Sequence, residues 1–320
     1  MRKTLYLVVV LVVLLLSTVN SFSQPGYSFA QKSFTKAITS MTTFQDNMIA
    51  LCFSDGTCSL MDKDGRVLAS QLIGPYREIF YIGYSASLGA LVGVDRTGNV
   101  YVLNSSTLNI INAFMAKKSD EESFLAVSLS GDGRYLAASS RYYVSSGGKR
   151  YLETRLAIID IGAQKRIFER DLYMTNDILV DVFSLDFWGN YLVTETIDTK
   201  RELCQLADNR IEVYKIEGQL VRKIASFQSG LTLKLIVGDF LVAQRVQQNS
   251  TGGYLTYVFT LPDLRIKTTR ILDRIQSLIP CNNNSFLAIF ADGTLQLCNL
   301  DLACSNLAPV PVSRVALRPC

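Results

Sequence analysis

The residues best suited to binding chemistry lie between residues 141 and 154, where tyrosines are interspersed with basic side chains. Tyrosine and arginine carry much of the binding energy at protein interfaces, and the same mixture can stack on sugars or meet an anionic group. The candidate binding residues are Arg141, Tyr142, Tyr143, Lys149, Arg150 and Tyr151. The Gly147-Gly148 step leaves a second interpretation open, an extended β-hairpin whose tyrosines pack on each other.

Histidine is absent from the sequence, and this absence restricts the catalytic chemistry. It excludes Ser-His-Asp and Cys-His nucleophiles, histidine general bases, and histidine ligands to metals or haem. Carboxylates are the remaining route to catalysis, and the candidate acids in one predicted repeat are Asp181, Asp186 and Glu195. We assign no catalytic residue, metal site or cofactor from the sequence.

A glycine-rich acidic turn, Gly131-Asp132-Gly133, invites comparison with phosphate and calcium loops. A phosphate loop opens a helix whose N-terminal amides bind the anion, whereas a strand-like run, RYLAASS, follows here. A calcium loop supplies several oxygen ligands at alternating positions, whereas Asp132 stands alone between glycines. Because Asp and Gly tolerate the positive φ of tight turns, we predict a structural corner.

The first 23 residues have the composition of a targeting segment. Arg2 and Lys3 form a basic start, residues 5–16 are an unbroken apolar run, and small residues precede a cut after Ser23. The apolar run is shorter than the roughly 20 residues that span a bilayer. This pattern favours a cleaved signal peptide over residues 1–23, with an uncleaved membrane anchor as the alternative. We expect a secreted, cell-surface or periplasmic protein, with membrane contact only through an uncleaved segment.

Seven cysteines are present, and this odd number leaves at least one thiol free or paired between chains. Cys52/Cys58 and Cys298/Cys304 have a C-x5-C spacing, unlike the C-x2-C spacing of common zinc sites. Export permits disulfides, so structural disulfides or buried thiols are the two interpretations. The disulfide candidates are Cys52, Cys58, Cys281, Cys298, Cys304 and Cys320, with Cys204 as the expected odd thiol.

Composition indicates one well-buried globular domain over residues 24–320. The chain has 320 residues, of which 48% are hydrophobic, and its mean hydropathy is +0.20. The formal net charge is +4, from 32 basic and 28 acidic residues that are mixed along the chain. This mixture is typical of a solvated surface, so no nucleic-acid partner is expected.

The elements that must position these residues are strands. Short runs rich in Val, Ile, Leu, Tyr, Phe and Thr are separated by Gly, Asn, Asp and Ser. One run recurs about every 40–50 residues, as MIALCFS, ALVGVD, YLAASS, YLVTETI, FLVAQRV and FLAIFA. One strand-like run precedes each and two follow, which predicts an all-β fold, a β-propeller of six four-stranded blades. The alternative is a seventh blade built from the N- and C-terminal strands at residues 27–34 and 310–317.

The chain resembles the WD40/YVTN-like β-propeller superfamily over about residues 37–300. The stretch SGDGRYLA at residues 130–137, followed by RLAIIDI at 155–161, is typical of these repeats. The resemblance implies the propeller fold. The chain lacks the Gly-His and Trp-Asp pairs of true WD40 repeats, and its single tryptophan is Trp188. No active site is therefore carried over from the superfamily.

Loop lengths indicate where such a propeller would bind. The connections between second and third strands, which share one face of a propeller, are short in blades one, two and six. They are long in blades three, four and five, at residues 141–154, 198–208 and 247–253. Enlarged loops on one side of a rigid scaffold commonly bind, although ordinary variation of surface loops gives the same pattern.

We therefore predict a binding or assembly module at the cell surface, whose partner is a protein or an envelope component. Two alternatives stay open. One is a hydrolase or lactonase-like enzyme with a carboxylate or metal site in the central channel, which we favour less because blades five and six have few acids on their inner strands. The other is a membrane-anchored structural subunit of an envelope complex.

Three N-x-S/T motifs, at Asn104, Asn249 and Asn283, fall in predicted loops. This motif is the acceptor for N-glycosylation, which suits the surface of an exported protein. The three asparagines are therefore candidate glycosylation sites.

Overall fold

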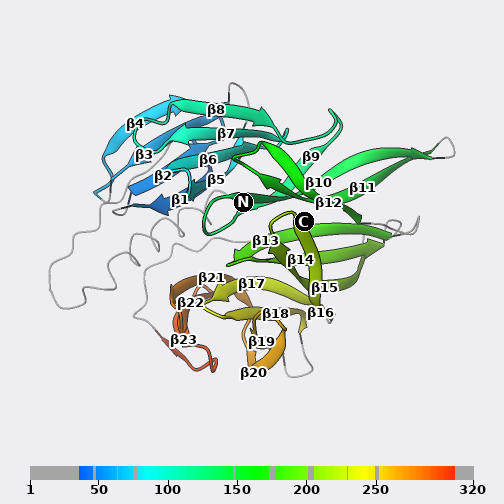
Figure 1. Cartoon of the computed structure of the whole chain (residues 1–320). Coiled ribbons are helices and arrows are strands. Elements are labelled where there is room, and N and C mark those ends of the chain that lie inside the picture. The colour runs from blue at the N-terminus through cyan, green and yellow to red at the C-terminus, as the bar shows by residue number, and fades with distance from the viewer. Residues whose placement is uncertain are drawn as a thin grey trace. The chain divides into compact units, whose positions relative to one another are not determined.

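The computed structural model describes residues 36–45, 48–62, 64–74, 78–146, 149–172, 178–200, 205–228, 230–248 and 252–306 of the chain. These residues form 24 strands in six four-stranded sheets (Figure 1). Each sheet takes four consecutive strands and pairs them in chain order. This is the architecture of a six-bladed β-propeller, so the predicted fold class is confirmed. The terminal segments 27–34 and 310–317, on which the seven-blade alternative depends, lie outside the described residues.

The first three sheets run from residue 38 to residue 172. Their strands are β1 (Ile38–Phe44), β2 (Met48–Phe53), β3 (Thr57–Met61), β4 (Val67–Leu72), β5 (Ile79–Ser85), β6 (Ala90–Asp95), β7 (Asn99–Asn104), β8 (Ile110–Met115), β9 (Ser123–Leu129), β10 (Tyr135–Ser146), β11 (Lys149–Asp160) and β12 (Lys165–Leu172).

The last three sheets run from residue 178 to residue 306. Their strands are β13 (Ile178–Trp188), β14 (Tyr191–Lys200), β15 (Gln205–Glu217), β16 (Leu220–Gln228), β17 (Leu231–Val237), β18 (Phe240–Gln248), β19 (Tyr254–Thr260), β20 (Arg265–Leu272), β21 (Ile275–Asn282), β22 (Ser285–Phe290), β23 (Leu295–Asn299) and β24 (Cys304–Asn306).

The described chain divides into two compact units. The first takes residues 36–136 and 159–166, and the second takes residues 137–158 and 167–306. The first unit therefore holds the first two sheets and β9. The second unit holds the fourth, fifth and sixth sheets and most of β10 and β11.

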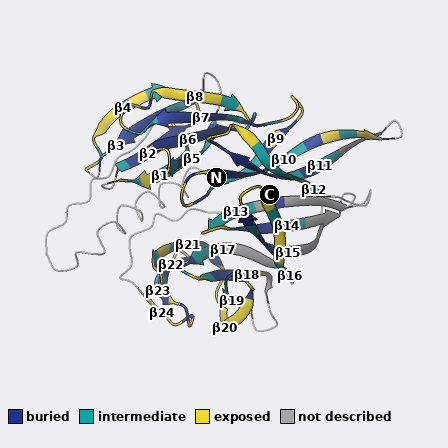
Figure 2. Cartoon of the chain, viewed as in Figure 1, coloured by how far each residue is buried: buried dark blue, intermediate teal, exposed yellow. Residues whose placement is uncertain are grey.

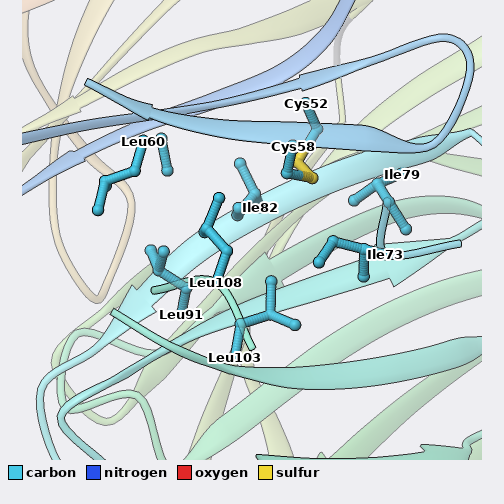
Figure 3. Packing of buried hydrophobic residues seen from close by; sticks show 10 residues of the cluster. Cys52, Cys58, Leu60, Ile73, Ile79, Ile82, Leu91, Leu103 and Leu108 are labelled. Atoms are coloured by element: carbon cyan, nitrogen blue, oxygen red, sulfur yellow. A yellow bond between two sulfur atoms is a disulfide. The ribbon is translucent and has the colours of Figure 1, made fainter. Parts of the chain in front are cut away.

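The core of the first unit joins the first and second sheets. Buried side chains of β2 and β3 pack with buried side chains of β5, β6 and β7 (Figure 3). The labelled members are Cys52, Cys58, Leu60, Ile73, Ile79, Ile82, Leu91, Leu103 and Leu108. A smaller cluster occupies the other face of the first sheet, around Leu51 and Phe53. Burial of both faces explains why the second strand of each repeat is a continuous apolar run rather than an alternating one.

In the second unit, the fifth sheet of the chain is also buried on both faces. Leu241, Ala243 and Phe259 pack with residues of the fourth sheet. The intervening Val242 and Val258 pack with residues of the sixth sheet. The middle strands of a sheet thus serve two cores at once, while the outer strands β4, β8, β16 and β20 have exposed stretches (Figure 2).

Side-chain hydrogen bonds to backbone connect successive sheets. The Ser40 hydroxyl accepts a bond of 2.7 Å from the Ile82 amide, and the Ser139 hydroxyl donates one of 3.0 Å to the Val182 carbonyl. The Gln244 amide group donates to the Asp273 carbonyl and accepts from the Ile275 amide, both at 2.9 Å. Buried polar side chains in these strands are satisfied by the neighbouring sheet, which fixes the register between sheets.

A residue with positive φ precedes the fourth strand of every sheet. The six residues are Gly65, Leu108, Gln164, Gly218, Leu264 and Leu302. Leu108, Leu264 and Leu302 are buried in the hydrophobic cores. In these three sheets the turn therefore places a leucine side chain in the core. The left-handed conformation costs a non-glycine residue about 1–2 kcal/mol, and burial of a leucine side chain contributes about 1.5–3 kcal/mol, which explains why leucine is retained there.

Candidate binding site

The predicted loop between residues 141 and 154 is a two-stranded ribbon. β10 and β11 each contain 12 residues, whereas their outer neighbours β9 and β12 contain 7 and 8. The hairpin therefore continues past the four-stranded part of its sheet (Figure 1). Residues 141–146 and 149–154 belong to the neighbouring strands β10 and β11 and are not a loop, while Gly147-Gly148, where the alternative hairpin was expected to turn, lies outside the described residues. Tyrosine, valine and threonine continue the strand pattern beyond the sheet and favour the ribbon.

Tyr142 is turned into the base of this ribbon rather than toward solvent. Its side chain is buried, and its hydroxyl donates a hydrogen bond of 3.0 Å to Oε2 of Glu153. The guanidinium carbon of Arg155 lies 4.1 Å from the centre of its ring, within the range of a cation–π contact. Burial, then the hydrogen bonds to Asp171 and Glu153, raise the pKa of Tyr142, so the phenol stays protonated and acts as a donor.

Arg155 is the centre of this cluster. Its Nε lies 2.7 Å from Oδ1 of Asp171 and 3.2 Å from Oε1 of Glu169, and its side chain is 12% exposed. Burial acts to lower the pKa of Arg155, but the hydrogen bond to Asp171 and the charges of Asp171 and Glu169 outweigh it and raise the pKa. β11 and β12 thus hold an arginine between two carboxylates, which stiffens the base of the ribbon. We name Tyr142, Glu153, Arg155, Glu169 and Asp171 the ribbon-base cluster.

The six predicted binding residues fall into three groups. Tyr143 is exposed, with 48% of its surface accessible, and Arg141 is half-buried. Tyr142 belongs to the ribbon-base cluster, where it already contacts Glu153 and Arg155, and its part in binding stays a prediction. The side chains of Lys149, Arg150 and Tyr151 lie outside the description of the structure, although their backbone belongs to β11.

The carboxylates and the arginine of the ribbon-base cluster were absent from the sequence prediction. A signal for them existed, because Glu153 and Arg155, like Glu169 and Asp171, are two residues apart. Side chains two apart in a strand share one face, so two such pairs on adjacent strands can meet. The sequence does not contain the register between β11 and β12, which decides whether they do.

The other two predicted long loops are also largely strand. In the fourth sheet, β14 continues to Lys200 and β15 begins at Gln205. In the fifth sheet, β18 continues to Gln248 and β19 begins at Tyr254. Residues 198–200, 205–208 and 247–248 of the predicted loops therefore belong to strands.

A second polar network lies between β12 and the fourth sheet. The Tyr214 hydroxyl donates to Oε2 of Glu212 at 2.6 Å and accepts from Nη1 of Arg170 at 3.2 Å. Lys223 Nζ donates to Oε1 of Glu212 at 3.0 Å. Burial acts to raise the pKa of Glu212, but these hydrogen bonds and the Lys223 charge outweigh it and lower the pKa. The groups satisfy one another, as expected of a packing contact between sheets.

The three candidate acids differ in their surroundings. Burial raises the pKa of Asp186 to about 6, against the weak effect of the Ser184 hydroxyl 3.5 Å away. Glu195 lies opposite Ser184 in the register of β13 and β14, so it shares a face with Asp186. Glu195 is the fifth residue of β14, the second strand of the fourth sheet. Ser139 and Gln244 hold the same position in β10 and β18, and the side chain of each donates a hydrogen bond toward the next sheet. The side chain of Asp181 lies outside the description.

The Gly131-Asp132-Gly133 turn is a structural corner, as predicted. Asp132 Oδ1 accepts hydrogen bonds from the Ser130 hydroxyl at 2.6 Å and the Arg134 amide at 3.0 Å. Gly133 has a φ of +74°, and a Cβ placed there would lie 2.3 Å from Cα of Ser85 in the second sheet. The glycine is required by the close approach of two sheets, not by a ligand.

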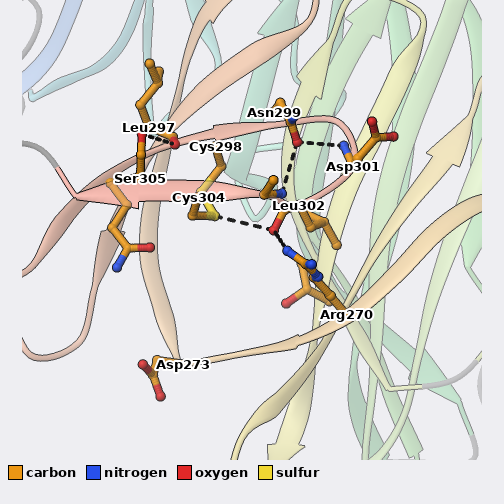
Figure 4. Close-up of a disulfide and its surroundings, with 12 residues drawn as sticks. Arg270, Asp273, Leu297, Cys298, Asn299, Asp301, Leu302, Cys304 and Ser305 are labelled. Carbon is orange, nitrogen blue, oxygen red and sulfur yellow. Dashed lines mark hydrogen bonds between the residues drawn. A yellow bond between two sulfur atoms is a disulfide. The ribbon is translucent and has the colours of Figure 1, made fainter.

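Two disulfides are present, and both join adjacent strands. Cys52 pairs with Cys58 across β2 and β3, and Cys298 pairs with Cys304 across β23 and β24. Figure 4 shows the second disulfide beside Leu302, whose carbonyl accepts a hydrogen bond of 2.9 Å from Nη1 of Arg270. Cys281 forms no disulfide within the described residues, and burial raises the pKa of its thiol. Cys204 and Cys320 lie outside the description.

Two of the three candidate glycosylation sites are described, Asn104 at the end of β7 and Asn283 in a turn. Asn104 Oδ1 accepts hydrogen bonds from the amides of Ser106 and Thr107, at 2.9 and 3.0 Å. Asn283 is exposed in the turn between β21 and β22, and Asn249 lies outside the description. Within the described ranges, no group of three or more Cys, Asp or Glu side chains is arranged to hold a metal, and no helix is long and apolar enough to cross a membrane.

Comparison with known proteins identifies the fold. No protein-family model and no curated protein matches the sequence. The structure of U3-55K covers 87% of this chain and 82% of its own at 13% identity, with a TM-score of 0.59. The WD40 repeats of RRP9 cover 87% and 81% at 12% identity, with a TM-score of 0.57. A chain of the Mitotic Checkpoint Complex covers 88% and 82% at 11% identity, with a TM-score of 0.60. The chain therefore has a WD40-like β-propeller fold, as the repeats predicted.

Proposed function

We propose that this protein is an exported β-propeller that binds a protein partner through the β10–β11 ribbon and the long hairpins of the fourth and fifth sheets. The single observation that supports this most is the ribbon, which continues past its sheet on a base locked by the ribbon-base cluster. A rigid projection with an exposed tyrosine limits the entropy that binding costs. The Mitotic Checkpoint Complex contains a similar propeller, which supports a role of this fold in protein assemblies.

Export has independent support. The basic start and the apolar run at residues 5–16 resemble those of a signal peptide, and the two disulfides suit an oxidising compartment. We propose cleavage after Ser23, secretion or retention at the cell surface or periplasm, and glycans at the candidate asparagines. The mass of the mature protein tests this, because an intact N-terminus would instead favour the membrane-anchored subunit of an envelope complex.

The binding proposal is tested by changing the ribbon without changing its base. The double variant Tyr143→Ala/Arg150→Ala is compared with Leu220→Ala, which alters an equally exposed residue on the outer strand β16. Partners are recovered by co-purification from the native envelope or medium, and compared by mass spectrometry. We expect the ribbon variant to recover at least tenfold less of a specific partner than the wild type does. The control should recover the wild-type amount. Equal recovery by both variants would refute the ribbon as the binding surface.

The hydrolase alternative depends on Asp186. A carboxyl group with a pKa of about 6 suits a general acid, and Glu195 shares its face of the sheet. The position of Glu195 matches residues that bond the next sheet, so we propose binding rather than catalysis. Hydrolysis of a lactone, ester or glycoside that Asp186→Asn abolishes would reverse this choice.

A further inference from the structure

The outer strands of the sheets differ in charge. β12, β16 and β20 each contain at least two charged residues, in the sequences KRIFERDL, LVRKIASFQ and RIKTTRIL. β4 and β8, with the sequences VLASQL and IINAFM, contain none. Charged residues on an edge strand prevent it from pairing with another chain. The outer strands of the first unit therefore lack the protection that the longer outer strands of the second unit have.

β8 is the most apolar of these edges. Ile111 is 61% exposed and Met115 is 57% exposed, with the exposed Ala113 between them. The half-buried Asn112 and Phe114 alternate with these three residues. β8 pairs with β7 along one edge, and no strand of the described residues pairs with its other edge. Figure 2 shows the exposed stretch along β8.

The sequence of β8 is suited to pairing with itself. Large apolar residues stand two positions before and two positions after Ala113. An antiparallel pair related by a two-fold axis at Ala113 places Ile111 opposite Met115 of the second copy, and Ala113 opposite Ala113 of the second copy. Apolar cross-strand pairs of this kind stabilise a sheet, and no like charges meet. The same pairing of β20 would bring arginines and a lysine together.

β4 is less suited to this contact. It shows the same exposed alternation at Leu68, Ser70 and Leu72, but its centre is polar. The Ser70 hydroxyl is already hydrogen-bonded to that of Ser59, at 3.0 Å. We propose that a second copy of this chain pairs with β8, edge to edge and antiparallel, to form a dimer with an eight-stranded sheet across the two-fold axis.

The oligomeric state of the purified full chain tests this proposal. Sedimentation velocity across a concentration series should show a monomer–dimer equilibrium, and Met115→Lys should weaken it at least tenfold. The matched control is Ile271→Lys on β20, where the replaced residue is 51% exposed and the edge is already basic. Both changes are at exposed positions, so both variants should unfold at the wild-type temperature. A monomer at every concentration, or a dimer unaffected by Met115→Lys, would overturn the proposal.

The register is tested by cross-linking. In a Cys204→Ser/Cys281→Ser/Cys320→Ser background, Ala113→Cys should give a disulfide-linked dimer on a non-reducing gel, because residues facing each other across strands are within disulfide reach. Thr269→Cys, which is exposed on β20, should give none. If Leu72→Lys abolishes the dimer and Met115→Lys does not, the contact lies at β4 and the β8 proposal is overturned. The dimer proposal is also overturned if the wild type is monomeric and binds phosphatidylcholine vesicles in a way that requires Met115. That result would show that the β8 edge contacts lipid.

Discussion

Two carboxyl groups in the fourth sheet, those of the buried Glu212 and the half-buried Asp186, have opposite electrostatic surroundings. Glu212 accepts hydrogen bonds from Tyr214 and Lys223, and these outweigh burial and lower its pKa. Asp186 has only a weak bond from Ser184, so burial dominates and raises its pKa to about 6. The ionised form is thus favoured at one position and penalised at the other.

This difference predicts opposite pH dependences for two neutral variants. Asp186 has a folded pKa above its unfolded value, so the stability it contributes is present below about pH 4 and is lost as the pH rises through 6. The free energy of unfolding of Asp186→Asn should therefore exceed that of the wild type by about 3 kcal/mol at pH 7.5 and approach it at pH 4. Urea unfolding at both pH values measures this.

Glu212→Gln is the control of opposite sign. Its folded pKa is lowered, so the stability it contributes is present at neutral pH and is lost as the pH falls through that pKa. The variant should be less stable than the wild type at pH 7.5, with the deficit shrinking in acid. A pH-independent difference for Asp186→Asn would contradict the raised pKa.

At the residue scale, sequence reasoning succeeded where the evidence was local. Asp132 between two glycines, followed by a strand, identifies a turn because both neighbours are visible in the sequence. The contacts of Tyr142 could not be predicted in this way. Its orientation depends on Arg155 and Asp171, which are 13 and 29 positions away, and on a strand register that only the folded sheet fixes.

At the element scale, the turn before each fourth strand combines strain with burial. Gln164 adopts a φ of +54° on the surface, whereas Leu302 adopts +57° inside the core. The left-handed backbone conformation costs both residues about the same free energy. Only at Leu302 does burial of the side chain offset this cost. Glycine substitution therefore has a different sign at the two positions.

Gln164→Gly should stabilise the protein by about 0.5–1 kcal/mol, because relief of the left-handed strain exceeds the added entropy of the unfolded chain. Leu302→Gly should destabilise it by about 2 kcal/mol or more, because the buried side chain is lost. Chemical denaturation of the two variants beside the wild type gives both values. If both changes destabilise equally, the offset between strain and burial is refuted.

The boundaries of the elements were predicted well where the pattern is strong. The second strands begin at Met48, Ala90, Tyr135, Tyr191 and Phe240, as the recurring runs indicated, and the sixth begins one residue early at Ser285. The predicted loops of the third to fifth sheets failed, because polar and tyrosine-rich stretches look like loops in composition. The apolar alternation that marks a strand is missing from these stretches.

At the scale of the whole molecule, the repeat predicts the propeller and the six sheets, since each sheet needs a neighbour to cover its apolar faces. The division into two units that share the third sheet has no counterpart in the sequence pattern. The packing of one sheet on the next depends on close approaches, such as that of Gly133 to Ser85, which appear in the sequence only as a glycine among other turn glycines.

Comparing variants at Gly133 and Gly293 separates the effect of turn strain on stability from the effect of packing between sheets. Both have positive φ, at +74° and +87°, but a Cβ at Gly293 meets nothing within 4 Å. Alanine at either position adds about 1–2 kcal/mol of backbone strain. Gly133→Ala should cost a further 1–3 kcal/mol because it collides with the backbone of Ser85. Thermal unfolding of the two variants measures the difference, and equal unfolding temperatures would show that the sheets can move apart at no cost.

The two cysteine pairs bear on how the chain would mature during the export that we propose. In each pair the cysteines are six residues apart, on strands that pair directly. Each of these two bridges can therefore close once its own short segment is in an oxidising compartment, before the rest of the polypeptide has folded. Neither bridge requires a search among distant thiols. We expect correct pairing without a disulfide isomerase, even though three further cysteines are present to compete.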